Sequence, residues 1–363
     1  MLSPAVLSRS STRAEIGTRV RAKVTKPAFW SGLIVNVMAE KQKIQRATRY
    51  ARPVVTRSRL MLETASELVG GDDWPYKQTL VQVREQGTAE WSLSFFASDS
   101  PEGIWEVGEK RADFAIINPA APATLAFRGT GPFKKPLPLR AITVIPSLDR
   151  IGFAVRKRTG LTSLLAIREK RYPLRVSMRG HLTHSVHLFI REVLAAAGLT
   201  LEEIGQWGGE VRYDDRVANG PKRMEALASG KIDAIFDEAL STWGNEALNS
   251  GMCFLPLDDP LLERLDALGF RRAPITRMQC SKLDHDVTSL DFSGWLVFTR
   301  DDVSDEIVRA FCHALEMRKD RIPWQGEGPL PLDSMCRDTP QGPLEIPLHP
   351  AAAQYWRERG YLS

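Results

Sequence analysis

The sequence has few cysteines and none of the common metal, nucleotide or nucleophile motifs. Four cysteines stand far apart without a CxxC pair: Cys253, Cys280, Cys312 and Cys336. This spacing excludes a zinc ribbon, and a disulfide framework is unusual in a chain of 363 residues, so we expect reduced thiols. HExxH, P-loop, GxGxxG and Ser-His-Asp patterns are also absent. The motifs therefore predict no metal and no cofactor.

Long apolar runs are missing as well. No run reaches the roughly 18 residues of a membrane-spanning helix. The short run Pro27–Ala39 follows a basic stretch, and Val37 and Ala39 suit the −3 and −1 positions of a signal-peptidase site. An amphipathic helix over about 29–49 is the plainer interpretation. The location stays open between cytoplasmic, if the N-terminus is not cleaved, and periplasmic.

Positive charge is concentrated at the N-terminus. The formal net charge is +5, and the first 60 residues contain nine Arg and four Lys against two Glu. Basic residues do not alternate regularly with aromatic ones elsewhere in the chain. We therefore predict a separate basic segment over 1–50 and no nucleic-acid partner.

Strand and helix patterns alternate from about residue 52 onward. Apolar runs predict strands over 53–56, 78–85, 91–98, 113–118, 173–180 and 233–238, and two long strands within 139–160. Helical spacing predicts helices over 59–69, after Pro101, over 184–197 and from Pro221. In the third of these, a buried stripe ends at Gly198 and comprises Val186, Ile190, Val193, Leu194 and Ala197. The alternation predicts an α/β fold with mostly parallel sheets.

Two segments share one design. Both "SPEGIWEVGEKRADFAIIN" and "GPKRMEALASGKIDAIFDE" run from Pro through a helix to an apolar strand. Two such halves predict two lobes that face a cleft. Ligands of open α/β sheets lie beyond the carboxyl ends of strands. The candidate ligand-binding residues are therefore Arg57, Ser58, Ser98, Ser100, Asn118, Arg179, Gly180, His181, Thr183, His184, Ser185, Asp237 and Trp243.

Three of the six histidines lie within seven residues: His181, His184 and His187. Their spacing of three covers about 120° of an ideal helix and has no metal motif around it, which argues against a metal site. In the ligand-binding interpretation, helix N–H groups and hydroxyls attract an anion and Arg179 grips its carboxylate. In the catalytic interpretation, His181 and His184 transfer protons while Arg179 anchors the substrate. His187 suits a structural role.

The chain from about residue 139 onward resembles the TAXI-type solute-binding proteins of TRAP transporters, which have the type II periplasmic-binding-protein fold. "LRVSMRGHLTHSVHLFIREVLAAAGLTLEEI" is similar to the family's strand, ligand loop and long helix. "EALASGKIDAIF" matches its helix-to-strand segment. The ending "PLEIPLHPAAAQYWRERG" carries the most specific match, in Pro347, Leu348, His349, Pro350, Ala352, Tyr355 and Gly360.

This resemblance implies two lobes joined by crossover strands, with 50–147 and 288–363 in lobe one and 148–287 in lobe two. It also implies a small organic anion as ligand, and a TRAP-type membrane carrier as partner. The sequence departs from the family at "TRSRLMLE", where a glycine-rich loop is usual, and at "RGHLTHS", where small residues are usual. We expect a solute-binding protein or a non-exported relative. The alternative is a cytoplasmic enzyme on the same scaffold, such as a decarboxylase of an aromatic carboxylic acid.

Overall fold

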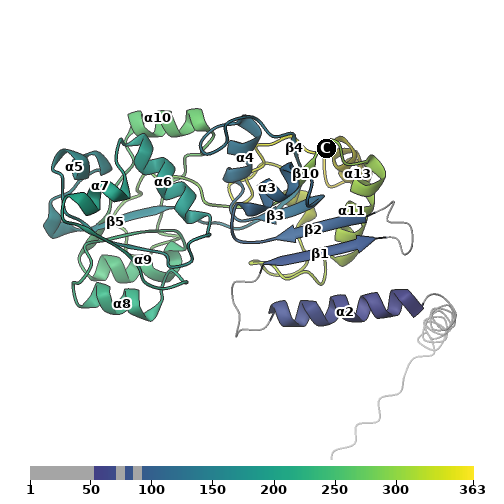
Figure 1. Cartoon of the computed structure of the whole chain (residues 1–363), viewed down its shortest axis with the longest axis horizontal. Helices are drawn as coiled ribbons and strands as arrows, with labels where there is room; N and C mark the ends of the chain where they lie inside the picture. Colours follow the sequence, from purple (N-terminus) through teal and green to yellow (C-terminus); the bar gives the residue numbers. More distant parts are fainter. Residues whose placement is uncertain (1–52, 71–77, 85–91) are drawn as a thin grey trace, which may run out of the picture. The chain divides into compact units, whose positions relative to one another are not determined.

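The computed structural model describes residues 53–70, 78–84 and 92–363 (Figure 1). The chain divides into two compact units, residues 1–75 and 76–363. The basic segment, the helix expected over 29–49 and the possible cleavage site at Ala39 lie outside the described residues.

The first unit contains helix α2, Pro53–Gly70. The strand predicted over 53–56 is wrong, because these residues begin the helix. Proline suits a first helical turn, and the apolar residues at 54 and 55 continue the helical spacing of those further along. A run of four residues is too short to distinguish the two-residue period of a strand from the 3.6-residue period of a helix.

The first sheet of the second unit has the strand order β1-β2-β3-β10-β4. Its strands are β1 Thr79–Arg84, β2 Ser92–Ala97, β3 Phe114–Ile117, β10 Trp295–Arg300 and β4 Leu139–Ile145. Only β2 and β3 pair in parallel within this sheet. Strand β10 returns from the C-terminal part of the chain and runs antiparallel to both neighbours.

The second sheet has the order β7-β6-β8-β5-β9. Its strands are β7 Glu210–Tyr213, β6 Arg175–Met178, β8 Ala234–Asp237, β5 Gly152–Arg156 and β9 Met252–Phe254. Strand β6 pairs in parallel with β7 and β8, while β5 is antiparallel to β8 and β9. The expectation of mostly parallel sheets is wrong, because strands that enter from another part of the chain reverse direction in both sheets. The predicted α/β class is confirmed, and its strands form two sheets.

Helices cover both faces of each sheet (Figure 1). Those that pack with the first sheet are α3 Glu102–Gly108, α4 Ala121–Arg128, α11 Asp305–Arg318, α12 Leu332–Met335 and α13 Pro350–Glu358. Those that pack with the second are α5 Leu164–Glu169, α6 Val186–Ala196, α7 Leu201–Gln206, α8 Pro221–Ala228, α9 Leu240–Asn249 and α10 Asp259–Leu268. A short 3-10 helix, Lys157–Thr159, follows β5.

Strand residues alternate between two hydrophobic cores. In β8, Ala234 and Phe236 join one core, which also contains residues of the first sheet, and Ile235 joins another core with Trp243 of α9. In β3, Phe114 packs toward α11 and α13, while Ala115 packs toward α3. Successive strand side chains point to opposite faces, so short apolar runs bury both faces of these strands.

Two crossover segments join the sheets and pair with each other at Arg150 and Asp291. The Arg150 guanidinium is buried and donates to Asp291 Oδ1 at 2.7 Å and to Ser293 Oγ at 2.8 Å. A buried pair of this kind fixes its segments, because losing one partner leaves an uncompensated charge.

Several local predictions are confirmed. The stripe on α6 is buried and Gly198 adopts a positive φ of 68°. Both helix-to-strand segments form, as α3 with β3 and α8 with β8. The four cysteines are free thiols, and His349 of the C-terminal motif caps α13 through its Nδ1 atom.

Candidate functional site

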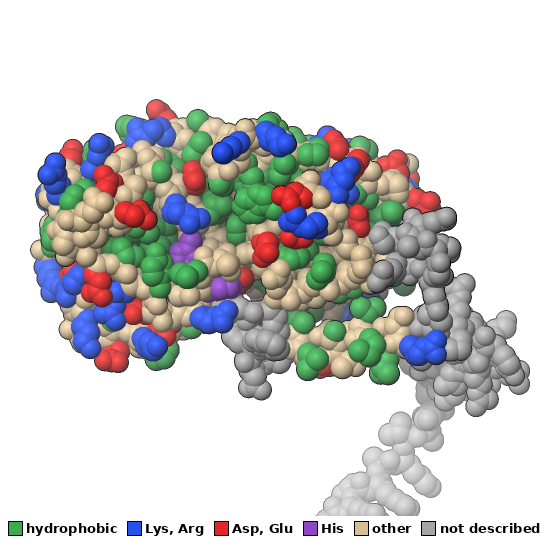
Figure 2. Space-filling view, viewed as in Figure 1, with side chains coloured by type: hydrophobic (Ala, Val, Ile, Leu, Met, Phe, Trp, Pro, Cys, Tyr) green, Lys and Arg blue, Asp and Glu red, His purple; other side chains and the backbone are tan. Residues whose placement is uncertain are grey.

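Loops that follow strands β2 and β6 meet in the second unit. Ser185 donates to the Asp99 carbonyl through its backbone N–H, at 3.2 Å, and through its Oγ atom, at 3.0 Å. Asp99 follows a strand of the first sheet, and Ser185 precedes helix α6 beside the second sheet. The structure therefore brings the predicted loops 98–100 and 179–185 together. On the face drawn in Figure 2, histidine side chains reach the surface near Lys and Arg side chains.

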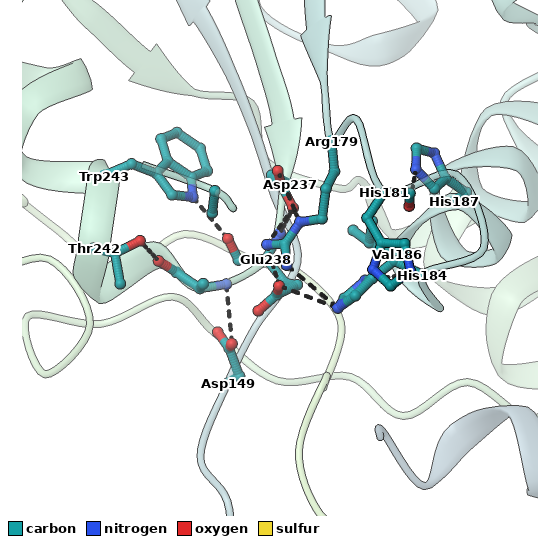
Figure 3. Close-up of polar contacts among 12 residues, drawn as sticks. Asp149, Arg179, His181, His184, Val186, His187, Asp237, Glu238, Thr242 and Trp243 are labelled. Atoms are coloured by element: carbon teal, nitrogen blue, oxygen red, sulfur yellow. Dashed lines mark hydrogen bonds and ion pairs between the residues drawn. The ribbon is translucent and has the colours of Figure 1, made fainter. Parts of the chain in front are cut away.

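Arg179 lies at the centre of this region and is already paired. Its side chain is buried, and its Nε atom lies 3.1 Å from Asp237 Oδ1 (Figure 3). Its terminal amine contacts Asp237 Oδ1 at 2.9 Å and also Glu238 Oε1. The guanidinium predicted to grip a ligand carboxylate thus holds two internal carboxyl groups, which contribute the charge-assisted contacts that a ligand would make.

A second buried arginine completes the pairing of Asp237. Arg223 donates to Asp237 Oδ2 at 2.5 Å, to the Ala218 carbonyl at 2.7 Å and to Ser177 Oγ at 3.0 Å. Arg223 and Asp237 are both 0% exposed. Burial alone raises the pKa of the Asp237 carboxyl, but Arg223 and Arg179 together hold that pKa below its ordinary value. Asp237 is therefore an ionised structural anchor.

Glu238 has the opposite electrostatic behaviour. Burial and the neighbouring Asp149 carboxyl raise the pKa of Glu238 well above its ordinary value. Asp149 comes from the crossover after β4, and its own pKa is raised by burial. The two carboxyls share a hydrogen bond, so each of them stabilises a proton on the other. Asp149 Oδ2 also accepts from the N–H of Ala239, whose φ of 57° turns the chain sharply after β8.

His184 lies beside this carboxyl pair and is neutral. Burial and the charge of Arg179 hold its pKa well below the ordinary histidine value. Its Nδ1 atom accepts from the Val186 N–H at 3.2 Å, which places the proton on Nε2. The Nε2 atom lies 3.8 Å from Glu238 Oε1 and 3.3 Å from an Arg179 amine. The 3.8 Å separation exceeds a hydrogen-bond distance, so His184 places a neutral ring beside Glu238 without bonding to it.

His181 and Thr183 form the more accessible side of the loop. His181 Nδ1 lies 3.2 Å from Asp99 Oδ2, and its Nε2 atom lies 3.1 Å from the Thr183 hydroxyl. Thr183 is exposed, and the His181 side chain is 13% exposed. His187 is buried, and its Nε2 atom pairs with the His181 carbonyl at 3.1 Å. His187 therefore supports the loop, as its sequence position indicated.

The remaining loop candidates occupy supporting positions. Ser98 and Ser100 bond to each other at 3.0 Å, and Ser100 Oγ accepts from the first N–H of α3 at 3.2 Å. Gly180 donates to the Asp215 carbonyl at 2.6 Å, and a Cβ atom at Gly180 would lie 3.1 Å from that backbone. Asn118 directly follows β3, is half-buried and precedes a cis proline.

Three candidates have settings other than a ligand loop. Trp243 is 0% exposed and packs in the core with Phe254, so it does not wall a cleft. Its indole donates to the Glu238 carbonyl at 2.7 Å, which fixes the turn after β8. Arg57 and Ser58 are exposed residues of α2, within a helix rather than after a strand.

Two functional side chains were missed by sequence reasoning, Arg223 and Asp149. Arg223 resembled an exposed residue of an amphipathic helix, and Asp149 stood in a polar crossover. The helix-to-strand segment that begins at Pro221 was a signal for Arg223, because it placed the N-terminus of α8 beside the end of β8. Within the described ranges, no group of three or more His, Cys, Asp or Glu side chains is arranged to hold a metal ion.

Three sizeable cavities, of about 450, 570 and 480 Å³, lie outside the Arg179 region. The third borders the back of the histidine loop through Leu182 and His187. The second is an apolar groove along α11 and β2. None of these three cavities is lined by Arg179, Asp237 or Glu238. The side chains of these three residues contact one another instead.

Among the described residues, no helix has both the length and the apolar character needed to span a membrane. Comparison with curated proteins finds no match.

Solved structures with similarity to this chain include three transport-related binding proteins. The alkanesulfonate-binding protein of Xanthomonas axonopodis pv. citri, bound to MOPS, is 13% identical, with 60% of this chain and 61% of that chain covered and a TM-score of 0.27. The periplasmic aliphatic sulphonate binding protein of Escherichia coli is 11% identical, with 58% and 53% covered and a TM-score of 0.28. A second substrate binding domain of a putative amino acid ABC transporter from Streptococcus pneumoniae is 13% identical, with 60% and 71% covered and a TM-score of 0.23. This chain thus spans less than two thirds of the length of the two sulfonate-binding proteins.

The family assignment comes from the sequence match, which covers residues 69–360 and extends across both sheets. The chain belongs to the NMT1-like family.

Proposed function

We propose that this protein binds a small organic anion, a carboxylate, where the loops after β2, β6 and β8 meet. Its role is that of a solute-binding protein, and we propose a TRAP-type carrier of the TAXI kind as its membrane partner. The family assignment supports solute binding. The C-terminal motif quoted above supports the finer assignment, since His349 and Tyr355 pack as structural residues of α13. We further propose that 50–147 and 288–363 form one lobe and 148–287 the other.

The observation that carries the carboxylate proposal is the geometry around Arg179. This guanidinium follows β6 and holds the carboxyl groups of Asp237 and Glu238. The site is therefore shaped for a carboxylate against a guanidinium, and a ligand carboxylate fits where Glu238 now lies. Thr183 and the His181 ring, on the accessible side of the loop, add donors for the rest of the solute.

Ligand-observed NMR tests this proposal. Acetate, succinate, L-glutamate and benzoate are mixed with the purified full chain, and saturation transfer to each ligand is recorded. Saturation transfer with constant ligand integrals indicates binding without turnover. Replacing Arg179→Met removes a charge-assisted contact of about 1.5–3 kcal/mol, so binding should weaken by about 10- to 100-fold. His285→Ala, at an exposed histidine, is the matched control and should bind as the wild type does. A folded Arg179→Met variant with unchanged affinity contradicts the carboxylate site.

A second candidate function is an enzyme that acts on a carboxylic acid. The observation that favours it is a buried pair of side chains with shifted pKa values: the pKa of His184 is held low and that of Glu238 is raised, and His184 Nε2 lies 3.8 Å from Glu238 Oε1. Shifted pKa values of this kind are typical of active sites. In this case, His181 and His184 act as acid and base and Arg179 anchors the substrate. The same NMR samples separate the two functions over time. The enzyme is supported if the wild type makes a ligand signal decay while a product signal grows. His184→Ala should then still bind the ligand but leave its signal constant.

A further inference from the structure

Glu238 contacts charged and titratable groups from three other parts of the chain. Arg179 comes from the end of β6, His184 from the loop before α6, and Asp149 from the crossover between the sheets. Asp237 is its neighbour in sequence, and the Glu238 N–H donates to Asp237 Oδ1 at 2.9 Å. Glu238 thus has two partners for its carboxyl group, the Arg179 guanidinium (Figure 3) and the Asp149 carboxyl.

Of the two carboxyls on Arg179, only Glu238 can be exchanged at low cost. Asp237 is fully buried and is held by Arg223 as well as by Arg179, so removing it would leave Arg223 buried without its ion pair. Glu238 loses only Arg179 and keeps the hydrogen bond to Asp149 when it carries a proton. The exchange requires a change of side-chain partner and no change in the strands.

We propose that Glu238 is an internal substitute for the ligand: a bound anion takes the face of Arg179 that Glu238 occupies, and Glu238 takes up a proton from solvent and keeps Asp149 as its partner. This inference rests on the proposed function, because it concerns the same site. It adds that solute binding and proton uptake are coupled.

The sign of the coupling follows from the charges around Glu238. Burial and Asp149 raise the pKa of Glu238, whereas the Arg179 charge acts to lower it. When an anion neutralises Arg179, this lowering influence is lost and the anion adds a like charge, so the pKa of Glu238 rises further. The protonated protein therefore binds the anion more tightly. Affinity is highest at low pH and falls as pH rises through the pKa of Glu238 in the free protein.

The other groups near the pair do not reverse this dependence. His184 stays neutral because its pKa is held low, and Asp237 stays ionised. The Cys280 thiol, which also senses Asp149, has a pKa raised to about 11 by burial and stays protonated. One proton is thus exchanged, and the affinity changes by at most about tenfold per pH unit.

The test is isothermal titration calorimetry of the full chain with acetate, succinate, L-glutamate and benzoate, at pH values from 5 to 9. Two buffers without anionic groups and with different ionisation enthalpies, bis-tris and Tris, report the number of protons taken up where their ranges overlap. Glu238→Gln keeps the shape and a hydrogen-bond donor toward Asp149 but cannot titrate. Its affinity should equal the low-pH value of the wild type at every pH, with no proton uptake. Glu246→Gln, at an exposed position of α9, is the matched control and should keep the wild-type pH profile.

Asp149→Asn provides an independent variant if Glu238→Gln folds poorly. Removing the Asp149 charge lowers the pKa of Glu238, so the fall in affinity should begin at a lower pH than in the wild type.

A wild type that binds a probe with buffer-independent enthalpy and constant affinity overturns the coupling and leaves the proposed function in place. The same holds if Glu238→Gln retains the wild-type pH profile. Failure of every probe to bind wild type and Glu238→Gln overturns both. Binding by Glu238→Gln alone at pH 8 supports the coupling.

Discussion

At the scale of single residues, burial decides which charged groups matter. Arg223 and Asp237 are completely buried and bonded to each other, whereas Arg272 pairs with Asp266 at the surface, where both side chains are about 40% exposed. An exposed pair contributes little, because water solvates its partners when they separate. Water cannot solvate the partners of a buried pair in this way, so removing one partner leaves the other charge uncompensated. The two arginines therefore differ in how much stability the protein would lose if each were removed.

Replacing Arg223→Ala should lower the free energy of unfolding by about 3–5 kcal/mol, because Asp237 loses one of its two guanidinium partners in a buried site. Urea denaturation at pH 7 measures this loss, and Arg272→Ala should change the midpoint little. The folded-state pKa of Asp237 is lowered, so its stabilising contribution is full above the unfolded value and is lost as pH falls through the folded value. The gap between wild type and Arg223→Ala should therefore narrow below about pH 4, and a gap that widens in acid contradicts this assignment.

At the scale of elements, the C-terminal helix is held by one buried carboxylate. Glu316 of α11 accepts from the Tyr355 hydroxyl at 2.6 Å, from Arg359 Nε at 2.9 Å and from the Tyr361 hydroxyl at 3.1 Å. Burial and the Glu316 charge raise the pKa of Tyr355 to about 12, so Tyr355 remains a donor at all ordinary pH values. Helix α13 is thus fastened to α11 by polar contacts in addition to Trp356, which is buried.

Replacing Tyr355→Phe should destabilise the protein by about 1.5–3 kcal/mol, since a charged acceptor loses a donor in a buried place. Chemical denaturation gives the magnitude, and native-state hydrogen exchange of the α13 amides shows whether the effect is local. Tyr361→Phe, at a less buried position, is the comparison and should cost less. Equal costs for the two variants would show that burial does not set the strength of these contacts.

At the scale of the second unit, hydrogen bonds join the two sheets and their helices in several places, and two of these places bear on the site. The crossovers are fixed by Arg150 with Asp291, and the loops touch where Ser185 donates twice to the Asp99 carbonyl. Under the proposed solute-binding function, the crossover contact persists through a hinge motion, whereas the loop contact breaks for a solute to enter. The proposal therefore assigns to the loop contact the role of holding the closed conformation.

Replacing Ser185→Ala removes one of the two loop contacts and should shift the closed-to-open equilibrium by about 1 kcal/mol, or roughly fivefold, toward the open form. Small-angle X-ray scattering of the ligand-free protein should show a larger radius of gyration than in the wild type. Ser229→Ala, whose hydroxyl bonds within α8, is the control and should scatter as the wild type does. An unchanged radius in Ser185→Ala means that the contact does not determine closure.

The sequence by itself determined many of the strands, the buried stripe of α6 and the two helix-to-strand segments. Such features depend on spacing within ten or twenty residues, and periodicity is visible over that range. Only the tertiary structure decided that Arg179 is paired and that Trp243 lies in the core. Arg179 is separated from Asp237 by 58 residues, and Arg150 from Asp291 by 141. Ion pairing and burial arise from chain segments that meet only on folding, so no local pattern carries them, and the tertiary structure alone gave the partners of Glu238.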